Sequence, residues 1–181
     1  MHSLRIKRLV LCAVLTTVIL LLTVLVKIPA PLGYVHIGDA AVCLAAVLLP
    51  APYAIAAAAL GGAASDLLGG FPAYAAFTAV IKASMTLAFT AKKERILVKR
   101  NVFAAILAGV ITPVGYLTCD AILLSLTGGG SFFSWQPWSA ALAALPFNSL
   151  QGAVSCVLFF VAAAALDGFH FKRRLSGWMS R

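Results

Sequence analysis

Long apolar runs, interrupted by proline, glycine and short basic clusters, dominate this sequence and fix the solvent in which it folds. Residues 9–28 read LVLCAVLTTVILLLTVLVKI, and a helix of about 20 apolar residues spans the hydrocarbon core of a bilayer. The chain of 181 residues carries only 10% charged residues, against about 25% in soluble domains. We therefore expect an all-α, polytopic membrane protein in which residues 1–181 form a single integral membrane domain.

Six apolar segments are predicted, most of them ended by proline- or glycine-rich stretches. They cover about residues 9–28, 38–49, 53–69, 73–91, 102–127 and 138–169. The second segment is short, because residues 38–49 rise only about 18 Å as a helix against a core of about 30 Å. It either extends into GYVHIG, forms a short helix buried among its neighbours, or joins the third segment as a hairpin broken at Pro50 and Pro52.

The basic residues cluster at the ends of the apolar segments, which indicates the orientation in the membrane. Six spans place all three clusters on one side, so the positive-inside rule predicts that both termini are cytoplasmic. Because the clusters do not line one polar face, nucleic acid is not an expected partner. The clusters hold twelve of the fourteen basic residues: Arg5, Lys7 and Arg8; Lys92, Lys93, Arg95, Lys99 and Arg100; and Lys172, Arg173, Arg174 and Arg181.

Metal, disulfide and enzyme chemistry find little support in the sequence. The three intramembrane aspartates are dispersed, and GGAASDLLGG lacks the lysine of a phosphate loop. We expect its small residues to form a thin helix surface for close packing. The prediction is binding without catalysis, with no cofactor and no metal. The cysteines have no CxxC spacing and are expected to be small buried side chains: Cys12, Cys43, Cys119 and Cys156.

Polar side chains within the apolar segments lie at similar depth and indicate a site. A charge at the helix centre costs roughly 2.5–3.5 kcal/mol on insertion scales, so each one needs a reason. We expect a polar cavity open to the outside, lined by segments four to six and the outer loops. Asp66, Thr78 and Trp138 share this depth. The candidate substrate-binding residues are Tyr34, His36, Asp39, Tyr74, Lys82, Tyr116, Asp120, Trp135, Asn148 and Gln151.

Structural interpretations of the same residues remain open. An N-terminal helix cap is the alternative for Asp39, and an ion pair with Asp66 or Asp120 is the alternative for Lys82. Anchoring at the membrane interface is the alternative for Trp135 and Trp138. Exposure in a loop is the alternative for His36, and hydrogen bonding between helices is the alternative for Asn148 and Gln151.

Four motifs follow one another in a characteristic order. HIGDA opens the second segment, GGAASDLLGG closes the third, IKA lies in the fourth and NSLQG in the sixth. In the order and spacing of these motifs the chain resembles the S component of an energy-coupling factor (ECF) vitamin transporter. The resemblance covers about residues 8–170 and is closest to the riboflavin, pyridoxine and hydroxymethylpyrimidine branch. It implies a six-transmembrane-helix bundle in the bacterial cell membrane.

The resemblance also implies a mechanism. The chain is expected to capture a water-soluble vitamin or related small heterocycle from outside and to deliver it inward with a T component and two ATPase subunits. Gly33 and Gly38 are expected to let the first outer loop fold over the site. Docking on the T component is expected to use small residues of the first segment, with an ordinary lipid-facing helix as the alternative. The nearest match is CAVLTT, which contains Cys12, Ala13, Thr16 and Thr17.

The ligand and two competing function classes stay open at this point. Aromatic residues suit a planar ring, Lys82 an anionic group or ring oxygen, and Asp120 an amine or hydroxyl. Pyridoxine, hydroxymethylpyrimidine, riboflavin, pantothenate and a queuosine precursor all remain open as ligands. A small intramembrane enzyme acting on a lipid would instead gather acids and a metal near the cytoplasmic side. A non-catalytic assembly subunit of another membrane complex would need no outward polar cavity.

Overall fold

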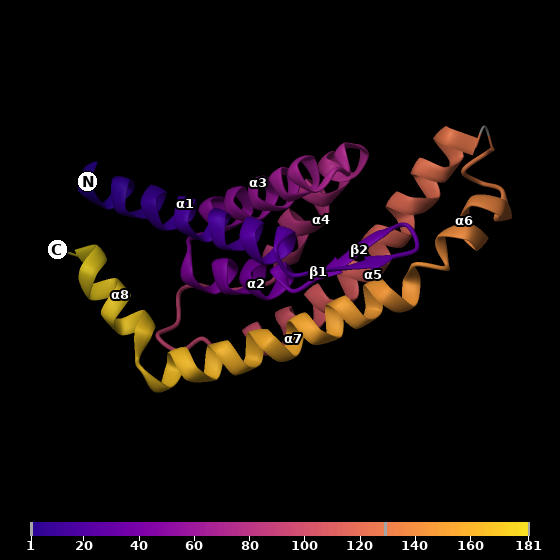
Figure 1. The fold of residues 1–181 in the computed structure, drawn as a ribbon. Helices are drawn as coiled ribbons and strands as arrows, with labels where there is room; N and C mark the ends of the chain where they lie inside the picture. The colour runs from indigo at the N-terminus through magenta and orange to yellow at the C-terminus, as the bar shows by residue number, and fades with distance from the viewer. Residues whose placement is uncertain (1, 129, 181) are drawn as a thin grey trace.

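The computed structural model describes residues 2–128 and 130–180 as a predominantly helical molecule (Figure 1). Within these residues, α1, α3, α5 and α7 are long and apolar enough to span a membrane. The prediction of a helical, polytopic membrane protein is confirmed at this level. In chain order the elements are α1 (His2–Val24), β1 (Lys27–Ala30), β2 (Gly33–His36), α2 (Gly38–Leu48), α3 (Ala51–Gly69), the 3-10 helix η1 (Pro72–Tyr74), α4 (Ala75–Thr86), α5 (Lys99–Gly128), α6 (Trp135–Ala141), α7 (Leu145–Gly168) and α8 (Phe171–Ser180).

The structure shifts the limits of several predicted segments. The first helix ends at Val24 because the following residues form a β-hairpin rather than a loop. Of the three alternatives for the second segment, the short helix buried among its neighbours is the one observed, since ten of the residues of α2 are buried. The fourth helix ends at Thr86, before the basic cluster. The sixth segment is divided into α6 and α7, and Pro146 lies in the first turn of α7, where proline is tolerated.

Small residues on α3 allow its neighbours to approach closely. The buried face of this helix consists of Ala54, Ala57, Ala58, Gly61, Gly62, Ser65 and Asp66. A Cβ atom on Gly61 would lie 2.8 Å from Ile19 Cγ2 on α1, and one on Gly62 would lie 2.9 Å from Lys82 Cγ on α4. The predicted thin helix surface is therefore confirmed. It brings α4, which carries the buried lysine, close to the centre of the molecule.

A second close crossing joins α5 to α7. A Cβ atom on Gly152 would overlap the carbonyl oxygen of Gly109, and one on Gly109 would lie 2.8 Å from Cys156 Sγ. The two backbones are therefore in direct contact where they cross. This contact sets the position of the polar residues of α5 and α7 that lie nearer to the hairpin.

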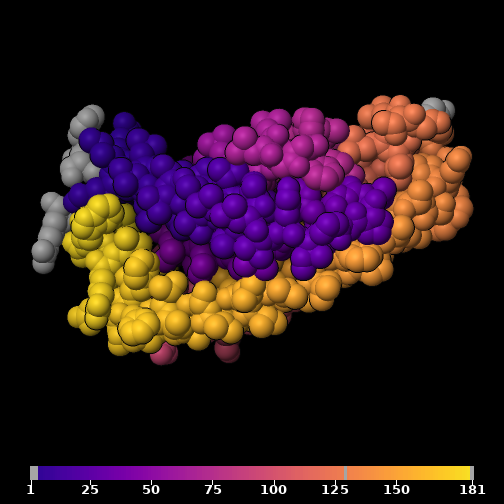
Figure 2. All heavy atoms as spheres, viewed as in Figure 1, coloured from indigo at the N-terminus to yellow at the C-terminus, as the bar shows by residue number. Residues whose placement is uncertain are grey.

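The hairpin formed by Lys27–His36 is antiparallel, with Lys27 paired to His36 and Ala30 paired to Gly33. On the face shown in Figure 2 it covers the surface between the magenta α3–α4 region and the orange α6–α7 region. It follows α1 directly and leads directly into α2. The hairpin is therefore placed to close over whatever lies between these helices.

The described residues of the three basic clusters lie at the end of the molecule where the N and C labels stand (Figure 1), and Arg181 lies outside the described residues. Lys7 Nζ donates to Trp178 O at 3.0 Å, and Lys172 Nζ donates to Ala91 O at 2.9 Å. The Asp167 carboxylate accepts from the backbone of the α4–α5 connection, at Ile96 N (2.7 Å) and Leu97 N (2.9 Å). The N-terminus, the α4–α5 connection and α8 thus form one basic end.

Candidate ligand-binding cavity

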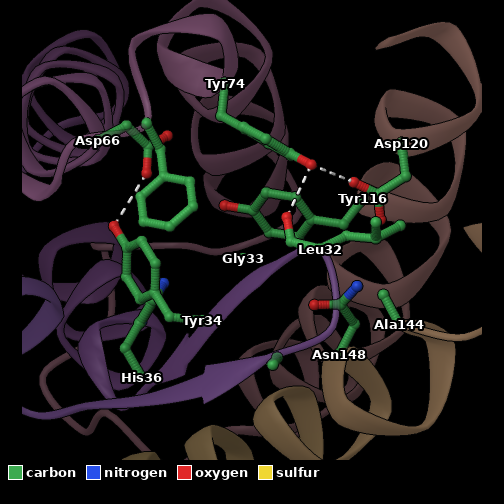
Figure 3. Close-up of a pocket in the computed structure, with 12 residues that line it drawn as sticks. Leu32, Gly33, Tyr34, His36, Asp66, Tyr74, Tyr116, Asp120, Ala144 and Asn148 are labelled. Atoms are coloured by element: carbon green, nitrogen blue, oxygen red, sulfur yellow. Dashed lines mark hydrogen bonds between the residues drawn. The ribbon is translucent and has the colours of Figure 1, made fainter. Parts of the chain in front are cut away.

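A cavity lies beneath the hairpin, between its turn and α3, η1, α5 and α7 (Figure 3). Its empty volume is about 440 Å³, which includes the open space at its mouth. The space enclosed by the side chains themselves is about 40 Å³, so the side chains lie close together around it. The cavity is lined by Ala30, Leu32, Gly33, Tyr34, His36, Asp66, Phe71, Tyr74, Tyr116, Asp120, Ala144 and Asn148.

Two tyrosine–aspartate pairs close the cavity. Tyr34 Oη donates to Asp66 Oδ1 at 2.9 Å, which ties the hairpin to α3. The Tyr74 hydroxyl lies 2.8 Å from both Leu32 O and Asp120 Oδ1, and its proton is donated to one of these two acceptors. Figure 3 shows both contacts as dashed lines. Burial, together with the Asp66 carboxylate, raises the pKa of Tyr34, so this hydroxyl remains a protonated donor at neutral pH.

An aromatic wall, formed by Tyr34, Phe71 and Tyr74, borders one side of the cavity. The ring centroids of Tyr34 and Phe71 are 5.1 Å apart, and those of Phe71 and Tyr74 are 6.2 Å apart. Tyr116 adds a further ring, and its hydroxyl lies 3.2 Å from Thr78 Oγ1. Such a wall provides flat apolar faces for a planar ligand.

A buried polar network lies next to the cavity without lining it. Lys82 Nζ on α4 forms an ion pair with Asp39 Oδ1 on α2 at 2.5 Å. Asp39 Oδ2 accepts from Thr112 Oγ1 at 3.1 Å and from Gln151 Nε2 at 3.0 Å. Gln151 Oε1 in turn accepts from the backbone N–H of His36 at 3.0 Å. The network therefore fixes the last residue of the hairpin to α2, α4, α5 and α7.

Three structural interpretations of these residues are wrong. Lys82 pairs with Asp39 rather than with Asp66 or Asp120. Asp39 is not a helix cap, because the N-cap residue of α2 is Ile37 and no side chain caps it. His36 is not solvated, since only 7% of its surface is exposed.

The buried His36 has a defined tautomer and charge. Its Nδ1 accepts from the backbone N–H of Gly38 at 3.1 Å, so a neutral ring carries its proton on Nε2. Burial lowers the pKa of His36 to about 4, so the ring is neutral at pH 7. Gly38 itself is required for close approach, because a Cβ atom there would overlap Thr23 Oγ1 on α1. This close contact, and not a flexible loop, explains the glycine at this position.

The predicted tryptophan contact is absent from the cavity. Trp135 is 72% exposed at the start of α6 and is not among the lining residues. Trp138 Nε1 donates to Phe132 O at 2.8 Å, which holds the α5–α6 connection against α6. Their position at the outer end of the sixth segment had suggested a ligand contact for Trp135, but its side chain is exposed at the surface instead.

Of the predicted site residues, six line the cavity and three belong to the adjacent network. The six are Tyr34, His36, Tyr74, Tyr116, Asp120 and Asn148, and the three are Asp39, Lys82 and Gln151. The structure adds Asp66 and Phe71 to the lining. The sequence feature that could have identified Asp66 as a site residue is its charge inside an apolar helix. Phe71 has no such feature apart from its position in the GGFP sequence between two segments.

The predicted docking residues divide between two faces of α1. Cys12 is buried, and its Sγ donates to Tyr53 O at 3.3 Å. The carbonyl oxygen of Thr16 faces Gly61 on α3. Ala13 and Thr17 are exposed, and Thr17 Oγ1 donates to Ala13 O within the helix. Only the Ala13–Thr17 pair is therefore available on the outer face.

Comparisons with known proteins give a consistent result. Residues 3–167 match the family described as "ECF-type riboflavin transporter, S component". A Pyrococcus woesei protein, described as "Uncharacterized protein in gap 3'region", is 31% identical over 114 residues, which cover 61% of this chain and 76% of that protein.

The fold is also similar to a solved structure titled "Structure and mechanism of the S component of a bacterial ECF transporter". The TM-score is 0.64 at 21% identity, and the match covers 98% of this chain and 99% of the other. The chain therefore belongs to the family of ECF-type riboflavin transporter S components, which are multi-pass cell-membrane proteins that bind the transported substrate and are not enzymes.

Proposed function

We propose that this chain captures a water-soluble vitamin or related small heterocycle from outside and delivers it inward with a T component and two ATPase subunits. The observation that carries the proposal is the closed cavity beneath the hairpin, which combines an aromatic wall with carboxylate and amide groups. A binding subunit needs such a cavity, whereas an assembly subunit does not.

The proposed topology has six membrane-crossing segments within one integral membrane domain, residues 1–181, with both termini in the cytoplasm. The short helices α2 and α4 contribute two of these segments. The basic end, formed by the N-terminus, the α4–α5 connection and α8, lies away from the turn of the β1–β2 hairpin (Figure 1). This separation supports an orientation in which the cavity opens outward and the basic residues remain inside.

The proposed ligand contacts are the predicted residues that line the cavity: Tyr34, His36, Tyr74, Tyr116, Asp120 and Asn148. Asp39, Lys82 and Gln151 act indirectly, by fixing the base of the hairpin through their buried network. Ala13 and Thr17 are the proposed docking residues for the T component, because they lie on the exposed face of α1.

Two measurements test the proposal. The chain is purified in detergent without its partners, and small molecules released on denaturation are identified by mass spectrometry. The chain is then reconstituted with a T component and the ATPase subunits, and uptake of the identified compound into proteoliposomes is measured with and without ATP. The proposal predicts a stoichiometric vitamin-like compound and ATP-dependent uptake. An empty protein that no vitamin stabilises would instead favour an assembly role.

A further inference from the structure

The charged side chains that line the cavity are all acidic. Asp66 and Asp120 are among the lining residues, and no lysine or arginine is. The buried Lys82 is already paired with Asp39. Lys27 is exposed on strand β1, with its Nζ 5.3 Å from the ring centroid of Tyr34. An anionic ligand in this cavity would therefore face two carboxylates without a lining cation to compensate them.

Asp66 has an unused acceptor in this cavity. The residue is 5% exposed, and its Oδ1 accepts from Tyr34. Its Oδ2 is buried and has no hydrogen-bond partner among the described residues. Thr78 is a close neighbour of this carboxylate but makes no hydrogen bond to Oδ2, and its hydroxyl lies 3.2 Å from Tyr116 Oη, where either oxygen can be the donor. A buried carboxylate oxygen without a donor is costly, so this geometry indicates a missing donor.

The opposite wall supplies complementary groups. Asp120 accepts at Oδ1 in its contact with Tyr74. Asn148 lies at the cavity with a side-chain amide that makes no hydrogen bond to the described residues (Figure 3). An amide offers both a donor and an acceptor. Between the two carboxylates, the aromatic wall provides the surface on which a flat ring can stack.

We propose that Asp66 is the principal ligand anchor and that the ligand is a planar nitrogen heterocycle bearing an amino group or a positive charge. Asp66 Oδ2 accepts a hydrogen bond from an N–H group of the ligand. Asp120 accepts from a second ligand donor or lies against the positive charge, and the Asn148 amide forms hydrogen bonds with the edge of the ring. Phosphorylated and carboxylate-bearing heterocycles are excluded by the same pair of acids. This inference rests on the proposed capture of a small heterocycle and narrows its chemistry.

The test compares ligands of different charge on the purified full chain. Dissociation constants are measured by isothermal titration for amino or cationic heterocycles (thiamine, pyridoxamine and 4-amino-5-hydroxymethyl-2-methylpyrimidine), neutral heterocycles (riboflavin and pyridoxine) and anionic compounds (the heterocycle pyridoxal 5′-phosphate and the acyclic pantothenate). Pyridoxamine, pyridoxine and pyridoxal 5′-phosphate share one ring and form the matched series. We expect the tightest binder to come from the first group. We also expect pyridoxamine to bind at least tenfold more tightly than pyridoxine or pyridoxal 5′-phosphate. This ranking uses the wild-type chain, so it does not depend on the folding of a variant.

The variant Asp66→Asn then tests the anchor. It keeps the shape of the side chain and removes its charge, so we expect the best amino ligand to lose about tenfold to a hundredfold in affinity. Glu94→Gln, which removes an exposed acid from the α4–α5 connection, is the matched control and should change affinity less than twofold. Melting curves establish that both variants are folded.

The outcomes separate the two proposals. Tight binding and ATP-dependent uptake of riboflavin or an anionic compound would overturn this inference and leave the capture function standing. The same holds for an amino ligand whose affinity is unchanged in a folded Asp66→Asn variant. If no compound binds and none is retained through purification, the capture function itself fails, and this inference fails with it.

Discussion

The ammonium group of Lys82 lies 2.5 Å from Asp39 Oδ1 and joins α4 to α2 within the apolar interior. Only 1% of each residue is exposed. Through Gln151 the same carboxylate is connected to the backbone of His36 at the end of the hairpin. The ion pair is therefore placed to hold the base of the hairpin rather than to meet an anionic ligand.

Removing one partner of this pair should strongly destabilise the fold. Lys82→Met leaves the Asp39 carboxylate buried without its counter-charge, and we expect the free energy of unfolding to fall by about 3–5 kcal/mol. The double variant Lys82→Met/Asp39→Asn removes both charges and keeps acceptors for Thr112 and Gln151, so it should recover much of this loss. Reversible unfolding in detergent measures both. The single variant Asp39→Asn is measured as well, and a double variant whose loss equals the sum of the two single losses would show that the two residues do not interact.

Stability should fall on mild acidification because of His36. Its pKa is about 4 in the folded chain, against an ordinary value of 6.5. Below pH 6.5 the unfolded chain takes up a proton that the folded chain does not. The free energy of unfolding therefore decreases as the pH falls from about 6.5 to about 4, by at most about 1.4 kcal/mol per pH unit. The contribution is fully present above pH 6.5.

The variant His36→Asn isolates this effect. The asparagine oxygen can replace Nδ1 as the acceptor for Gly38 N, but it does not titrate. We expect unfolding measured in detergent between pH 4 and pH 8 to show a shallower pH dependence than in the wild type. Identical slopes for His36→Asn and the wild type would contradict the assignment.

The crossing of α5 and α7 should not tolerate one added methyl group. Gly152→Ala places a Cβ atom against the Gly109 carbonyl, and we expect a loss of about 1–3 kcal/mol in the free energy of unfolding. Gly168→Ala lies on the same helix, where a Cβ atom meets nothing within 4 Å. It should be neutral or slightly stabilising, because alanine favours the helix. Melting temperatures in detergent test the pair, and equal values would show that the close crossing is not maintained in solution.

The Tyr74 hydroxyl should control how long a ligand stays in the cavity. Tyr74→Phe removes the contacts to Leu32 O and Asp120 Oδ1, which join the hairpin turn to α5. We expect ligand dissociation to accelerate by about tenfold or more, because a hydrogen bond to a charged group contributes about 1.5–3 kcal/mol. Tyr53→Phe on α3, whose hydroxyl makes no hydrogen bond to the described residues, is the control. The dissociation rate of the retained ligand is measured by competition with an excess of a second ligand. Equal rates for Tyr74→Phe and the wild type would show that other contacts hold the hairpin.

The exposed face of α1 should determine docking without affecting ligand capture. Ala13→Trp introduces a large side chain between α1 and the T component, and we expect co-purification of the T component to be lost while ligand affinity is unchanged. Val161→Trp, on the exposed face of α7, is the matched control and should retain the partner. Retention of the T component by both variants would place the docking surface elsewhere.

The sequence alone determined the class of the molecule and the places where its helices lie. Long apolar runs and the scarcity of charge are sufficient for this, because the free energy of inserting a helix into the bilayer is set mainly by the hydropathy of its own residues. The order of the motifs indicated the family, and six of the ten predicted site residues line the cavity. The i, i+4 spacing of Tyr116 and Asp120 was sufficient to place both on one helix face.

Only the tertiary structure decided which polar groups face one another. Helical spacing identifies a face but not the helix that packs against it, so the sequence did not reveal that Lys82 pairs with Asp39. The hairpin was missed because its strands are short and contain Pro29, which weakens a strand signal. For the same reason, Asp66 lines the cavity although it was expected only as a possible partner of Lys82, and Trp135 is exposed although it was expected to contact the ligand. Whether a side chain lines a cavity depends on how the backbones around it cross, and that is fixed by close contacts such as Gly109 with Gly152.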